Sequence, residues 1–139
     1  MATEAVTGQM NDDPRKLRAL LTRVETLARD HAMSSVVVGL AAEEGDRSFP
    51  EFVDYLRSTL RVEDGIFRMT RERVVLHLAD LDRERATEVL ERLMESFQSE
   101  FSSVSEPSLV LRFLEVKPGQ ESPNVKDVLT AIFSGHTLH

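Results

Sequence analysis

Apolar residues recur along the chain with two spacings, one typical of helices and one typical of strands. From residue 14 to 28 they follow helical spacing, and the step Asp13-Pro14 is a typical start for such a helix. A β-branched run at 34–40 (SSVVVGL) then predicts a central strand. An acidic loop follows it, and a second helical stripe predicts a helix from about residue 50 to 61.

The second half of the chain predicts a hairpin, a long helix, a strand and a final helix. The hairpin turn is expected at 70–72. In the strand after this turn, His77 alternates with Val75 and Arg73, which predicts a partly exposed histidine. The predicted strands are 65–69, 73–78 and 109–116, and the predicted helices are 82–100, capped by Asp80 or Asp82, and a last one capped by Asn124.

The resulting order of elements is α-β-α-β-β-α-β-α. Two β-α-β crossovers around a hairpin predict an α+β fold with a ferredoxin-like βαββαβ antiparallel sheet, helices on one face, and extra N- and C-terminal helices. Residues 1–12 are small, polar and acidic, so we expect a disordered N-terminal segment there. Residues 13–139 are expected to form a single domain.

Charge and composition exclude several classes of function. A formal net charge of −7 would repel nucleic acid and anionic membranes, so neither is an expected partner. The chain has no cysteine, which excludes disulfides, thiolate metal sites and cysteine nucleophiles. No apolar run reaches membrane-spanning length, and the N-terminus lacks the basic and apolar regions of a signal peptide. We therefore expect a cytoplasmic protein.

The segment 64–78 (DGIFRMTRERVVLHL), in this order of elements, resembles the GGDEF domain, the nucleotide-cyclase-like fold of diguanylate cyclases. In that family an aspartate precedes a strand that ends in arginine and an aromatic residue, and the Gly-Gly-Asp/Glu-Glu-Phe signature follows. Asp64 and Arg68 stand at the matching places, and Met69 replaces the aromatic residue. The signature itself is occupied by Thr70-Arg71-Glu72-Arg73-Val74. The resemblance implies a degenerate GGDEF-like domain from residue 13 onward.

The departures from the family pattern predict a catalytically inactive domain. The signature glycines let the backbone approach a nucleoside triphosphate, but Thr70 and Arg71 stand in their places. Only Glu72 remains of the acidic pair, and Arg73 reverses the second charge. The resemblance also implies a metal-binding aspartate near residues 39–41, where the sequence is Gly-Leu-Ala. Phosphoryl transfer relies on Mg²⁺ to offset phosphate charge, and a single carboxylate is a poor ligand set for that ion. We therefore expect no metal site and no catalytic residue.

Arg61 and Asp64 form an Arg-x-x-Asp motif five residues before the signature position. Many active cyclases bind their product, cyclic di-GMP, through such a motif, so the resemblance implies a ligand site at Arg61 and Asp64, with Arg68 nearby. An arginine can donate two bonds to guanine or phosphate, and an aspartate can accept from guanine N–H groups. Local structure is the alternative explanation, since arginine suits the last turn of a helix and Asp-Gly suits the turn that leaves it.

These observations favour a non-catalytic GGDEF-like regulatory or protein-interaction module in signalling, with no cofactor and with a protein partner of unknown identity. A cyclic di-GMP receptor that uses Arg61 and Asp64 is the first alternative. A divergent nucleotide cyclase that uses Glu72 ranks last. The apolar first and last helices can pack on the domain or cover a partner, which leaves a homodimer open.

Overall fold

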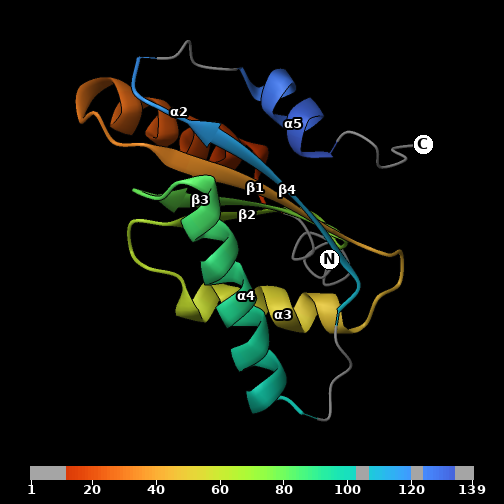
Figure 1. The fold of residues 1–139 in the computed structure, drawn as a ribbon. Coiled ribbons are helices and arrows are strands. Elements are labelled where there is room, and N and C mark those ends of the chain that lie inside the picture. Colours follow the sequence, from red (N-terminus) through yellow and green to blue (C-terminus); the bar gives the residue numbers. More distant parts are fainter. Residues whose placement is uncertain (1–11, 103–106, 120–123, 134–139) are drawn as a thin grey trace.

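The structure is a computed structural model that describes residues 12–102, 107–119 and 124–133. Its elements follow the predicted order, and the predicted α+β class is confirmed (Figure 1). In chain order they are α2 (Pro14–Asp30), β1 (Ser35–Ala42), α3 (Ser48–Thr59), β2 (Gly65–Thr70), β3 (Arg73–Ala79), α4 (Arg83–Glu100), β4 (Leu109–Val116) and α5 (Val125–Phe133). Residues 1–11 of the predicted disordered segment lie outside the described residues. None of the helices in these ranges has the length and apolar character of a membrane span.

The four strands form one antiparallel sheet in the order β2-β3-β1-β4. The central strand β1 pairs with both β3 and β4, so that Ser35 lies opposite Ala79 on one side and Val116 on the other. The edge strand β2 pairs with β3 alone, with an irregularity between Arg68 and Thr70. This strand order, with α3 and α4 as the crossover helices, is the predicted ferredoxin-like sheet.

Helices cover both faces of the sheet (Figure 1). The crossover helices α3 and α4 pack on one face, where Phe52 and Phe97 are in edge-to-face contact. The terminal helices α2 and α5 pack on the other face, with Val24 and Ile132 in a second core. The two crossover helices thus lie on one face, as predicted, and the terminal helices, whose place the sequence left open, pack on the domain itself. The physical reason is visible in β1, which is buried on both faces and needs a cover on each.

Helix α3 lies two residues earlier in the chain than its sequence pattern predicted. The Asp46 carboxylate accepts hydrogen bonds from the N–H groups of Ser48 at 2.8 Å and Phe49 at 3.1 Å, and so caps the helix before the proline. At the other end, Leu60 is extended, with ψ 152°. Arg61 therefore lies in the turn after the helix and not in its last turn.

His77 is buried in β3, with 0% of its surface exposed, so the prediction of a partly exposed histidine is wrong. The face of β3 that carries it lies under α2, in the second core. Its Nε2 lies 2.9 Å from the hydroxyl of Ser35, and its Nδ1 has no hydrogen-bond partner in the described structure. Burial lowers the pKa of His77 to about 4; the charge of Asp64 opposes this shift, and the charges of Arg23 and Arg61 add to it.

Candidate functional site

Arg61 and Asp64 are in direct contact in the turn between α3 and β2. The Nε and Nη2 of Arg61 donate to the two carboxylate oxygens of Asp64 at 2.9 and 2.8 Å, which makes a two-point ion pair. The backbone closes the same turn, because Arg61 N–H donates to the carboxylate at 3.2 Å and Asp64 N–H donates to the Arg61 carbonyl at 3.0 Å. The two residues of the Arg-x-x-Asp motif thus meet through their own local structure.

The pair is also anchored to the end of β3. Asp64, whose side chain is only 3% exposed, accepts a hydrogen bond from Ala79 N–H at 3.0 Å. Arg61 Nη2 donates to the Ala79 carbonyl at 2.7 Å. The hydrogen bond to Asp64 is the main reason that the pKa of Arg61 lies above its ordinary value. Asp64 therefore acts as a buried acceptor that fixes the position of the Arg61 guanidinium.

Part of the Arg61 guanidinium remains open to a ligand. A guanidinium has five N–H donors, and the bonds to Asp64 and Ala79 engage Nε and Nη2. The remaining nitrogen, Nη1, lies 3.5 Å from the Glu63 carboxylate at the surface. Because the Arg61 side chain is 44% exposed, Nη1 can exchange this solvated contact for a stronger acceptor.

A groove of about 650 Å³ extends from this pair along α4. The α4 wall contributes two arginines, Arg85 and Arg92, and two glutamates, Glu84 and Glu88. Together with Arg61, the groove therefore holds three cations. Arg85 and Arg92 were not predicted as site residues. Their seven-residue spacing, which places both on one side of an amphipathic helix, could have indicated them.

Arg68, the third predicted ligand residue, does not line this groove. Its Nη2 donates to the carboxylate of Asp54 on α3 at 3.1 Å, and its backbone N–H donates to the Asp12 carboxylate at 2.7 Å. Arg57 donates to the same Asp12 carboxylate at 2.7 Å. Burial alone would raise the pKa of Asp12, but the bonds from Arg68 and Arg57 outweigh it and lower the pKa. A ligand role for Arg68 stays a prediction.

The signature position is a tight turn between β2 and β3. Thr70 pairs with Arg73 across the hairpin, and its hydroxyl accepts from Glu72 N–H at 3.2 Å. The Glu72 carboxylate accepts from Gly45 N–H at 3.3 Å and lies 3.7 Å from Arg71 Nε. The single acid of the turn is therefore engaged with the loop after β1 and with its own neighbour.

The end of β1, where the resemblance implied a metal-binding aspartate, lies under α5. A Cβ added to Gly39 would lie 2.7 Å from both the Cβ and the carbonyl oxygen of Ile132. Arg73, which is paired with Ala41 on the neighbouring strand, holds its guanidinium 5.7 Å from the centre of the Phe133 ring. Within the described ranges, no group of three or more His, Cys, Asp or Glu side chains is placed to hold a metal ion.

No protein-family model matches the sequence, and no curated protein matches it either. Solved structures do match. PelD from Pseudomonas aeruginosa PAO1, solved from residue 158 to its C-terminus, superposes with a TM-score of 0.66 and 21% identity over 87% of this chain and 45% of that one. The GGDEF domain of DgcB from Caulobacter crescentus, solved in complex with c-di-GMP, superposes with a TM-score of 0.61 and 12% identity, over 82% of this chain and 76% of that one. A DGC protein from Thermotoga maritima superposes with a TM-score of 0.54 and 14% identity, over 84% of this chain and 86% of that one.

These superpositions confirm the fold that the resemblance implied. The chain has a GGDEF-like fold, and at such low identities the similarity shows the fold alone. The chain also spans less than half the length of the PelD structure that it matches.

Proposed function

We propose that this GGDEF-like domain is a non-catalytic regulatory module that binds cyclic di-GMP in the groove beside Arg61. The observation that carries the proposal is the placement of the Arg61 guanidinium. It is fixed by Asp64 at one end of a groove whose α4 wall carries Arg85 and Arg92. The DgcB GGDEF domain, which shares the fold, was solved with c-di-GMP bound.

The chemistry of the groove suits a guanine dinucleotide. Guanidinium groups donate to phosphate oxygens and to the O6 and N7 edge of guanine, and Arg61 and Arg92 can supply such donors. Because the oxygens of Asp64 are already engaged, Glu84 and Glu88 are the open acceptors for guanine N–H groups. The groove volume of about 650 Å³ is within the usual range of ligand sites.

Isothermal titration calorimetry with cyclic di-GMP tests the proposal. We expect saturable binding by the wild-type chain, and binding at least about tenfold weaker after Arg92→Ala or Arg61→Ala, because each removes a charge-assisted donor. Arg29→Ala, which removes an exposed arginine of α2 outside the groove, should leave the affinity unchanged.

Arg92→Ala is the decisive variant. Arg61→Ala also deprives the buried Asp64 of its partner, so its fold must be checked by circular dichroism. Arg92 is exposed and makes no ion pair with any residue that the structure describes, so its loss should leave the fold intact. Absence of binding heat for the wild-type chain at high ligand concentration would overturn the proposal.

The absence of cyclase activity is a separate prediction. Incubation of the chain with GTP and Mg²⁺ or Mn²⁺ should yield no cyclic dinucleotide by chromatography, with an active diguanylate cyclase as the positive control. The reason is that the turn at 70–72 has no glycine, and the carboxylate of its one acid, Glu72, accepts a hydrogen bond from Gly45 N–H. Turnover that Glu72→Ala abolishes would contradict this prediction and favour the divergent cyclase.

A further inference from the structure

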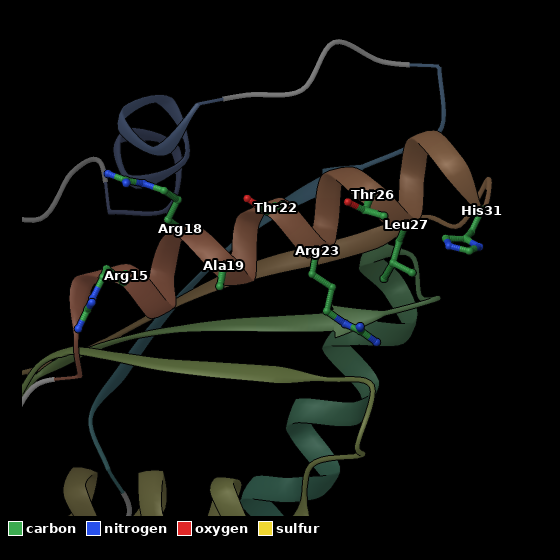
Figure 2. Close-up of a pocket in the computed structure, with 8 residues that line it drawn as sticks. All are labelled: Arg15, Arg18, Ala19, Thr22, Arg23, Thr26, Leu27 and His31. Atoms are coloured by element: carbon green, nitrogen blue, oxygen red, sulfur yellow. The ribbon is translucent and has the colours of Figure 1, made fainter.

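The side of α2 that points away from the sheet is a shallow hollow of about 580 Å³ with basic edges (Figure 2). Its middle is formed by the small residues Ala19, Thr22 and Thr26. Figure 2 shows Arg18 and Arg23 pointing to opposite sides of the helix, one on each flank of these small residues. The opposite side of α2 is the one that packs on the sheet, through Leu17, Leu20, Val24 and Ala28.

The positive charge of this face is largely uncompensated. Arg15 forms an ion pair with Asp13 at 2.6 Å. Arg18 and Arg23, in contrast, make no ion pair with any residue in the described part of the chain. The molecule as a whole has a net charge of −7, so this face is a basic patch on an acidic protein.

Helix α4 carries the opposite charge along its outward side. Glu84, Glu88, Glu91 and Glu95 recur at spacings of four, three and four residues, which places them in one stripe. All four are exposed, and none forms an ion pair within the described ranges. The two helices are also matched in length, with 17 residues in α2 and 18 in α4, or roughly 26 Å each.

We propose that the outward face of α2 docks on the glutamate stripe of α4 in a second copy of this chain. The small residues of α2 allow another helix to approach closely, and Arg18 and Arg23 would then lie beside glutamates of the stripe. Docking of α2 on a second α2 would instead place arginines against arginines. Charge complementarity therefore selects α4 as the partner surface.

The position of the two helices determines the kind of assembly. Since α2 and α4 cover opposite faces of the sheet, the two surfaces of one molecule point away from each other (Figure 1). A contact between unlike surfaces is heterologous, so we expect head-to-tail assemblies in place of a closed two-fold dimer.

Sedimentation velocity over a concentration series tests this contact, without any nucleotide in the sample. At about 0.02 M salt the mean sedimentation coefficient should rise with protein concentration, and at about 0.5 M salt the rise should disappear because exposed charges are screened. The double variants Arg18→Glu/Arg23→Glu and Glu91→Arg/Glu95→Arg should each remain monomeric at low salt. An equimolar mixture of the two should associate again, since each reversed face complements the other variant.

The controls separate this contact from a general charge effect and from the nucleotide site. Arg47→Glu/Arg112→Glu makes the same change in net charge as Arg18→Glu/Arg23→Glu, at two exposed arginines outside both helices, and it should associate like the wild type. Glu91 and Glu95 were chosen because they do not line the groove beside Arg61. The proposal would be overturned if the wild type were monomeric at low salt or if either reversed variant associated alone. It would equally be overturned if the mixture or the control variant stayed monomeric.

Discussion

Between pH 7 and pH 4, the folded domain should lose about 3 kcal/mol of stability through His77 alone. Burial lowers the pKa of His77 to about 4 in the folded chain, whereas its ordinary value is 6.5. The unfolded chain therefore binds the extra proton in this range, and the folded chain does not. The stabilisation is fully present above pH 6.5 and is lost as the pH falls toward 4.

Urea unfolding at several pH values measures this dependence. His77→Gln should flatten it, because glutamine does not titrate and its amide can still bond to the Ser35 hydroxyl. His31→Gln serves as the control, since the side chain of His31 is exposed, and it should retain the wild-type slope. A slope that persists in His77→Gln would show that other groups cause it. Measurements should stay above pH 4, because the pKa values of Asp12 and Asp30 are also lowered and these groups add their own acid sensitivity.

Gly39→Ala should destabilise the domain by about 2 kcal/mol, although alanine is normally the better residue in a strand. The new Cβ would lie 2.7 Å from the carbonyl oxygen of Ile132 as well as from its side chain. A change of rotamer cannot relieve contact with a backbone atom, so α5 would have to move away from β1. We expect the loss in the free energy of unfolding, together with faster hydrogen exchange in α5.

Gly65→Ala is the matched control for this substitution. It adds the same atom to another strand, but there the nearest neighbour is the Leu20 side chain at 3.4 Å, which is close to ordinary contact. Its effect should stay within about 1 kcal/mol. If Gly39→Ala were as stable as the wild type, the close packing of α5 on β1 would be contradicted.

The order of elements could be predicted because both periodicities are strong in this chain. The predictions that failed had two causes, one distant in sequence and one local. The alternation in β3 predicted that His77 lies on a partly solvent-exposed face. That face is instead covered by α2, which comes from a distant, earlier part of the chain. The start of α3 was missed because Asp46, in a segment that reads as a loop, supplies the cap.

The candidate site could also be predicted only in part, because some of its contacts are local in sequence and others are distant. The spacing of Arg61 and Asp64 is local, so the sequence placed both residues at the end of a helix, but it assigned Arg61 to the last helical turn and not to the turn that follows. The engagement of Asp64 by Ala79, fifteen residues away, depends on how β3 ends and could not be read from the motif. Arg85 and Arg92 belong to a helix that only the tertiary structure brings to the groove.

The position of α5 determines whether a metal site could be built at the end of β1. An aspartate placed at residue 39 would meet Ile132, and one placed at 41 would be buried in the core that α2 and α5 share. Either carboxylate would also lie near the cation of Arg73, which is stacked on Phe133. Placing the family signature at 70–74 would replace Arg73 but would leave Ile132 against residue 39, so the change in the turn alone would make no room for an ion. An ion site at this end of β1 would therefore require α5 to be repacked as well, so several substitutions would have to be made together.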